Sequence, residues 1–200
     1  ALVDALQNLS GDGYSDYRSD EETLGLLASV YKNISVSTGD RDFARFSKEI
    51  YLIGFKDTGS YWHGINVATL LYIARDIQAA KEYAMKVIKI ATNKLRKADD
   101  DEKFWLYATI GEAHLLCGKT ELAKEAYEAA IEAPKLSHAK KLSALRQLHL
   151  LKHSGCEIPG DLFGLLQPPS IIVFTGHMID HNTRTTPRFP RHLEHAVRQE

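Results

Sequence analysis

The 200-residue chain contains only two cysteines and almost no net charge, and each absence excludes a class of protein. Cys117 and Cys156 lie far apart, without the Cys-x-x-Cys spacing of a zinc knuckle. The sequence therefore argues against a disulfide framework and predicts a reducing compartment, the cytoplasm. The formal net charge is −1, so the whole molecule has no electrostatic bias toward nucleic acid or anionic membranes, and neither is expected as a partner.

Long apolar runs and the common catalytic or phosphate-binding motifs are absent as well. No apolar run approaches the roughly 20 residues that span a bilayer. There is no HExxH, GxGxxG or GxxxxGK[ST] pattern. With 44% apolar and 26% charged residues, the composition is that of an ordinary globular chain, long enough for one sizeable domain and a piece of another.

What is present is a helix–turn–helix pattern with small residues at fixed offsets. Gly111, Ala123 and Ala130 are the small positions, Tyr127 is the aromatic one, and Gly118 marks a tight turn. Small side chains allow two antiparallel helices to touch, as in a tetratricopeptide repeat. Such units bury their apolar faces against one another and usually present a binding surface.

The same pattern occurs about 43 residues earlier, a longer period than the roughly 34 residues of the standard repeat. Its members, at equal internal spacings, are Ala68, Ala80, Ala84 and Val87. Helical periodicity predicts antiparallel pairs at about 21–55, 60–97 and 102–133, of which the first matches the repeat only loosely. A closing helix is expected near 137–153, and short helical segments near 1–10 and 161–166.

The composition changes after the closing helix. A β-branched run at 170–175 predicts a strand, followed by a loop that begins at Gly176 and a helix near 190. The fold class is therefore a mostly α, antiparallel helix-pair solenoid with a short strand–loop–helix piece of a truncated α/β domain. The expected organisation is a helical-repeat domain at 1–156, a linker at 157–169 and the incomplete domain at 170–200. We expect the chain to be an excerpt of a larger protein.

Two segments resemble a known family. Residues 22–32, with the sequence ETLGLLASVYK, are similar to the ETLxLLGRIYK segment in the TRAF-binding part of the apoptosis signal-regulating kinases. Residues 51–55 (YLIGF) and 61–71 (YWHGINVATLL) are similar to a second segment of that region. The resemblance covers about 20–75 and, more weakly, the chain to about 150. It implies a tetratricopeptide-like regulatory region that recruits partners and controls an attached signalling domain. After residue 157 the chain departs from the kinases, which favours the arrangement of similar bacterial proteins.

Four residues are candidates for partner binding. Tyr61, Trp62 and Trp105 lie at predicted helix starts, where they form either an aromatic recognition surface or part of the core. Asn66 either contacts a ligand or bonds backbone at a helix junction. Packing and backbone bonding are the favoured interpretations for these residues, because buried polar groups normally have partners.

The residues after the predicted strand form a candidate ligand site. A glycine beyond the carboxyl end of a strand allows the backbone to approach a phosphate, and nearby arginines supply positive charge. The site would consist of Gly176, His177, Asp180, Arg184 and Arg188 and would bind a nucleotide or another anion. The alternative is an ordinary turn, and the sequence does not decide between them.

No metal site or cofactor is expected. Two histidine pairs, 177 with 181 and 192 with 195, have spacings that suit a helical metal site, but solvated or loop-bonded histidines are favoured. His114 is expected to be packed, and Cys117 to be a small apolar residue. The sequence thus predicts a non-catalytic interaction or regulatory module of a larger signalling protein, which binds a protein or another domain of its own chain. The alternative is the sensor arm of an enzyme or nucleotide-binding protein whose ligand domain begins near Ser170.

Overall fold

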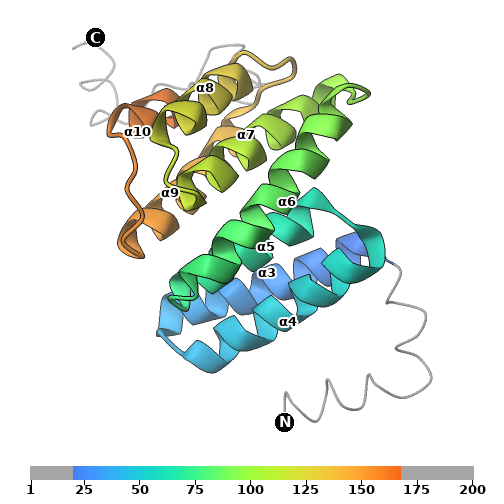
Figure 1. Cartoon of the computed structure of the whole chain (residues 1–200), viewed down its shortest axis with the longest axis vertical. Helices are drawn as coiled ribbons and strands as arrows, with labels where there is room; N and C mark the ends of the chain where they lie inside the picture. Colours follow the sequence, from blue (N-terminus) through green and yellow to red (C-terminus); the bar gives the residue numbers. More distant parts are fainter. Residues whose placement is uncertain (1–19, 168–200) are drawn as a thin grey trace, which may run out of the picture. The chain divides into compact units, whose positions relative to one another are not determined.

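The computed structural model describes residues 20–167, which form eight helices and no strand (Figure 1). None of these helices is long and apolar enough to cross a membrane. In chain order they are α3 (Glu21–Thr38), α4 (Arg41–Thr58), α5 (Tyr61–Ile73), α6 (Ile77–Leu95), α7 (Asp100–Leu116), α8 (Thr120–Ile131), α9 (His138–His153) and α10 (Asp161–Leu166). The three helix pairs and the closing helix are therefore confirmed. The expected helix near 1–10, strand at 170–175 and helix near 190 lie outside the described residues.

Local sequence signals account for the helix ends. The side chains of Asp20, Asp40 and Asp99 accept hydrogen bonds from backbone N–H groups in the first turns of α3, α4 and α7. Gly118, between α7 and α8, has φ 73°, a left-handed conformation that favours glycine over residues with a Cβ. These caps and turns make each pair a compact helical hairpin.

Small residues lie at the crossings of the second and third pairs, as the repeat pattern predicts. A Cβ added at Gly111 would lie 2.7 Å from the Tyr127 ring and 3.3 Å from the Ala123 backbone oxygen. Gly111 and Ala123 therefore meet where α7 crosses α8. All four members of the earlier pattern, Ala68, Ala80, Ala84 and Val87, are fully buried. The backbones approach closely because nothing larger separates them.

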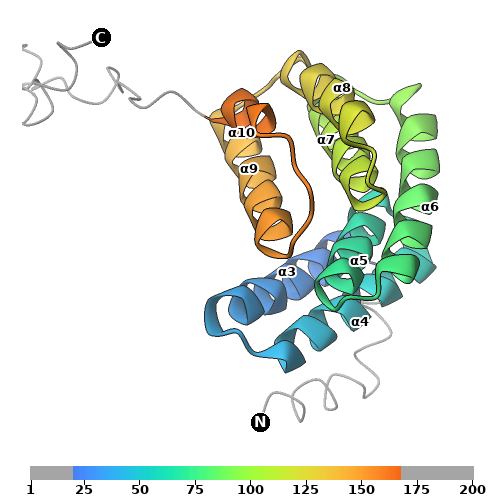
Figure 2. The ribbon, with the colours of Figure 1, turned by 60° about the vertical axis from the view of Figure 1, so that its left-hand side comes forward.

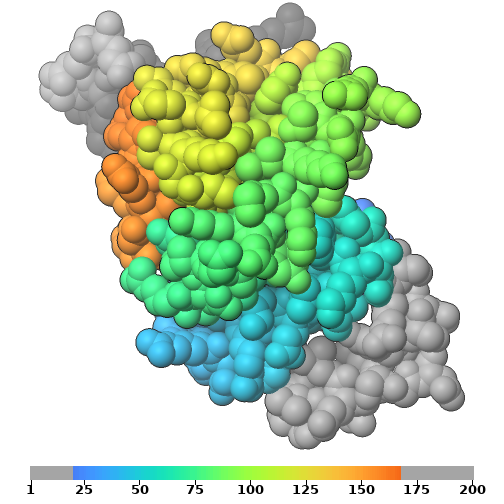
Figure 3. Space-filling view, viewed as in Figure 1, coloured from blue at the N-terminus to red at the C-terminus, as the bar shows by residue number. Residues whose placement is uncertain are grey.

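The first and second helices of the pairs form two rows. We call α3, α5, α7 and α9 the first helices. The second helices α4, α6 and α8 form most of the face shown in Figure 3, coloured from cyan-blue through green to yellow. In Figure 2, the lower end of α9 lies above α3. The two end members of the row of first helices therefore approach each other.

The end of the stack is completed by α10. It contacts both α8 and α9 and lies within the segment expected to be a linker, 157–169. Leu162 and Leu166 are fully buried in the core that α7, α8 and α9 share. An ion pair of 2.5 Å between Lys124 and Asp161 joins α10 to α8. The helical unit therefore continues to Gln167.

Candidate functional site: a polar cluster shared by four helices

Polar side chains occupy the same face of α5 and α7, where helical spacing aligns them. Positions i, i+4 and i+7 lie on one side of a helix. On α5 these positions are Trp62, Asn66 and Thr69, and on α7 they are Trp105, Thr109 and Glu112. Asn66, Thr69, Thr109 and Glu112 are all buried, which is unusual for a set that contains a carboxylate.

Glu112 is at the centre of a network that we call the polar cluster: Lys32, Asn66, Thr69, Glu112 and Gln147. Its Oε1 accepts a hydrogen bond from the Thr69 hydroxyl at 2.5 Å. The same oxygen accepts a second bond from Gln147 Nε2 at 2.7 Å. These donors lie on α5 and α9, so a carboxylate from α7 is bound by two other helices. These two donors offset part of the cost of burying the carboxylate.

Lys32 of α3 forms the other end of the cluster. Its ammonium donates to Asn66 Oδ1 at 2.6 Å and to Gln147 Oε1 at 3.3 Å. Asn66 Nδ2 in turn donates to the Trp62 carbonyl oxygen at 2.9 Å. The backbone bond expected for Asn66 is thus present, and its oxygen serves Lys32 as well. The cluster therefore contains one side chain each from α3, α7 and α9 and two from α5.

The Gln147 amide lies between the two charges with its polarity matched to them. Its oxygen faces the Lys32 ammonium, and its NH₂ group faces the Glu112 carboxylate. The reverse orientation would place donor against donor and acceptor against acceptor. Among the ion pairs of residues 20–167, none joins Lys32 to Glu112 within 4.0 Å. The amide thus bridges two opposite charges that do not touch.

Burial perturbs both charged groups in the direction that favours their neutral forms. Desolvation raises the pKa of Glu112, and the bonds from Thr69 and Gln147 and the charge of Lys32 only partly oppose it. Desolvation lowers the pKa of Lys32, against the attraction of Glu112. As whole residues Lys32 and Gln147 are only partly buried, whereas Asn66, Thr69 and Glu112 below them are buried.

The aromatic candidates separate into packing residues and one exposed residue. The Trp62 ring fills the space above Gly25 of α3, where an added Cβ would lie 2.2 Å from a ring atom. It also stacks on His63 at 5.4 Å between centroids. Trp105 is 38% exposed and makes an edge contact with Phe104 at 5.2 Å. Trp62 therefore supports the packing interpretation. Trp105 instead exposes its indole at the surface, on the same side of α7 as Glu112.

Tyr61 belongs to a different group. Its hydroxyl donates to Glu102 Oε1 at 3.4 Å, and Lys94 lies 5.1 Å above its ring while pairing with Glu102 at 2.6 Å. Burial, with Glu102 nearby, raises the pKa of Tyr61. This group ties α5 to α6 and α7, and no bond connects it to the polar cluster. The structure thus brings Asn66 and Trp62 together and places Tyr61 elsewhere.

Sequence reasoning missed Lys32, Thr69, Glu112 and Gln147. One available signal was Glu112 itself, a carboxylate inside an otherwise apolar stretch of α7. Its alignment with Thr69, at the same place one repeat earlier, was a second signal. Lys32 and Gln147 stand 115 positions apart and gave no local indication of contact.

The remaining predicted residues carry no site among the described residues. His114 is half-buried, and burial lowers its pKa, as expected for a packed histidine. Cys117 is a free thiol whose pKa burial raises, consistent with a small apolar residue. No group of three potential metal ligands occurs within residues 20–167. The candidate ligand residues Gly176, His177, Asp180, Arg184 and Arg188 lie outside the described residues, as do the two C-terminal histidine pairs.

Comparison with known families supports the repeat character of the N-terminal part. Residues 1–71 match a family model described as Tetratricopeptide Repeats-Sensor. The matched range contains α3, α4 and most of α5, and therefore three members of the polar cluster: Lys32, Asn66 and Thr69. No curated protein and no solved structure matches the chain. This part of the chain is thus similar to a tetratricopeptide-like sensor region.

Proposed function

We propose that the helical region is a non-catalytic sensor or interaction module, whose first helices bind a segment of a protein. The observation that carries the proposal is the polar cluster, which joins α3, α5, α7 and α9 in one network. A bound segment that changed one of these contacts would act on every helix pair at once. The similarity of residues 1–71 to a repeat-sensor family supports the same conclusion.

The accessible groups indicate where such a segment binds. Trp105 offers an exposed indole, and Lys32 and Gln147 offer the partly buried edge of the cluster. Trp105 lies two helical turns before Glu112 on the same side of α7, and aromatic anchors and convergent polar groups are both common in recognition surfaces. The bound segment belongs either to a separate protein or to another domain of the same chain. The resemblance to the apoptosis signal-regulating kinases favours control of an attached effector domain in the cytoplasm.

The chemistry of the cluster supports binding rather than catalysis. Burial raises the pKa of the Glu112 carboxyl group. A shift of this kind often marks a general acid or base. Its Oε1 is occupied by Thr69 and Gln147, however, and no hydrogen bond among the described residues joins Glu112 to a thiol or an imidazole that would complete a catalytic pair. We therefore assign it a role in holding the helices.

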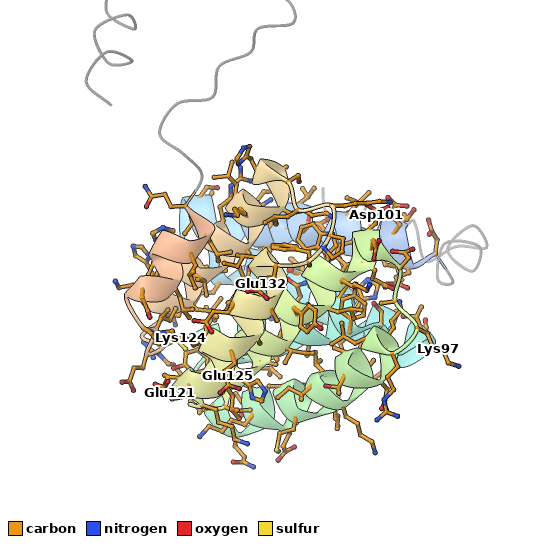
Figure 4. All side chains as sticks on the ribbon, turned by 90° about the horizontal axis from the view of Figure 1, so that it is seen from above. Lys97, Asp101, Glu121, Lys124, Glu125 and Glu132 are labelled. Carbon is orange, nitrogen blue, oxygen red and sulfur yellow. The ribbon has the colours of Figure 1, made fainter. Side chains whose placement is uncertain are left out.

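Selection from a displayed library of random 16-residue peptides tests the binding surface on the full chain. Peptides that bind through this surface should lose at least tenfold in affinity with Trp105→Ala or Lys32→Met. Leu122→Ala is the matched control, because Leu122 is a comparably exposed apolar residue on a second helix, α8. Figure 4 shows its neighbours Glu121 and Glu125 on that helix. Binders that ignore both first-helix variants and depend on Leu122 would contradict the proposal.

A second candidate function is the sensor arm of a nucleotide-binding protein or enzyme. The sequence motif that favours it is Gly176 after the apolar run at 170–175, with Arg184 and Arg188 nearby. Titration of the longer protein with ATP, GTP and NAD should then show binding that Gly176→Val and Arg188→Ala weaken. Equal affinity in all three proteins, or no binding at all, would exclude this second candidate and leave the first unaffected.

A further inference from the structure

We infer that Gln147 acts as a latch between α3 and α9, the two end members of the row of first helices. Its hydrogen bonds set the separation of these two helices. The part of the inference that concerns regulation of the binding surface rests on the proposed function. The latch itself is a property of the chain without any bound partner.

The link is unusual for a repeat stack. Units of a helical solenoid contact their immediate neighbours, so the shape follows from successive local interfaces. Here the Lys32–Gln147 bond joins residues 115 positions apart, from the first described pair to the helix after the third. A direct tie between distant units restrains the curvature of the whole stack in a way that neighbour packing does not.

Apolar packing holds each end of the link to a different part of the molecule. Leu148 and Leu151 of α9 are fully buried in the core that includes α7, α8 and α10. Ala28 and Tyr31 of α3 belong to a separate core with α4 and the second half of α5. Each of the two cores can remain intact if the link opens. The contacts that would be lost are the polar ones at Gln147.

The two charges make this link selective for an amide. Gln147 supplies an acceptor to Lys32 and a donor to Glu112, which neither an apolar residue nor a single charge can do. Leucine at 147 would leave both charges without this partner. Glutamate at 147 would attract Lys32 but repel Glu112. Opening is therefore a discrete exchange of hydrogen-bond partners.

Release of the latch and occupation of the surface are linked. Gln147 covers the Glu112 and Thr69 groups from the α9 side. A peptide that binds Glu112 through its own amide NH₂ group replaces Gln147 Nε2, which donates to Glu112 Oε1 in the free chain. Binding would then convert a local exchange into a change of the α3–α9 distance, which is the signal that an attached domain can detect.

The test measures that distance by pulsed electron paramagnetic resonance in the full chain. Spin labels are attached through bio-orthogonal residues at Asn33 on α3 and Ser143 on α9, both exposed, so that the native cysteines are kept. We expect Gln147→Leu to broaden the distance distribution and shift it to longer values. Arg146→Ala, an exposed neighbour on α9, should keep the parent distribution. An unchanged distribution in a folded Gln147→Leu protein would overturn the inference.

A charge exchange keeps the test decisive if Gln147→Leu does not fold. Gln147→Glu alone should open the latch, because two carboxylates then face each other. Gln147→Glu combined with Glu112→Gln places the carboxylate toward Lys32 and an amide at 112, and should restore the parent distribution. Failure of the double variant to restore it would contradict the latch. Peptides from the library are then added to the parent protein. Peptide binding without any change in the α3–α9 distance would refute the coupling and leave the latch standing. A longer distance in the Gln147 variants, with no peptide whose binding depends on Trp105 or Lys32, would refute the proposed function and leave the latch standing.

Discussion

At the scale of single residues, Glu112 is the group most sensitive to its surroundings. Its pKa is raised on folding, so the folded chain binds a proton more readily than the unfolded chain does. The associated stability is present below the unfolded pKa and is lost as the pH rises through the folded pKa. Glu112→Gln keeps both hydrogen bonds to Oε1 and removes the charge.

We therefore expect Glu112→Gln to be at least as stable as the parent at pH 7, with a flatter dependence of stability on pH above 4.5, the ordinary pKa value for this group. Glu112→Leu should lose about 3 kcal/mol, because Thr69 and Gln147 then lose their hydrogen-bond acceptor in a buried site. Urea unfolding at several pH values measures both. A Glu112→Gln protein that is destabilised as strongly as Glu112→Leu would show that the charge itself stabilises the fold.

Burial of His63 should make the stability of the fold depend on pH in the opposite direction. It is fully buried, neither ring nitrogen has a hydrogen-bond partner, and desolvation lowers its pKa from 6.5, with Glu21 partly opposing. The unfolded chain therefore takes up this proton first, and stability falls as the pH drops below about 6.5, by up to about 1.4 kcal/mol per unit. His63→Leu should flatten that acid limb, measured by thermal unfolding from pH 7.5 to 5. The exposed His138→Leu is the control and should leave the limb unchanged.

At the scale of helices, the crossing of α7 and α8 depends on residues without bulk. Ala123 is fully buried against Gly111, so Ala123→Glu would place an unpaired carboxylate there and should cost about 3–5 kcal/mol. Leu122→Glu introduces the same charge one residue earlier at a site that is 42% exposed, and should cost less than about 1 kcal/mol. Chemical denaturation compares the two. Equal midpoints would mean that α7 and α8 do not cross at this pair.

The same contrast explains what the sequence can predict. Helix pairs follow from local signals: Asp20 and Asp40 cap the first two helices, and Gly111 and Ala123 mark a crossing within one hairpin. The polar cluster forms instead because the curvature of the stack brings α9 to α3. That curvature results from several successive helix–helix interfaces together. No local pattern contains that sum. Asn66 was identified as polar and buried, but its partner Lys32 lies 34 positions away on another pair.

At the scale of the whole molecule, α10 determines where the helical unit ends. A boundary at residue 156 would exclude α10, whose Leu162 and Leu166 are fully buried against the core formed by α7, α8 and α9. Removing two buried leucines costs about 2–5 kcal/mol each in typical cores. A chain of residues 1–156 would therefore expose apolar surface on α8 and α9 and lose a large part of its stability.

We expect the 1–156 chain to unfold at a markedly lower urea concentration than the 200-residue chain. Leu162→Ala in the full chain should reproduce a part of that loss, about 2–4 kcal/mol, because it removes one of the two buried side chains. Leu165→Ala is the matched control, since Leu165 is only partly buried on the same helix and should cost less. If 1–156 unfolds together with the full chain, α10 contributes nothing to the core. The latch would then be anchored by α7 alone, because α10 is the other helix against which α9 packs closely.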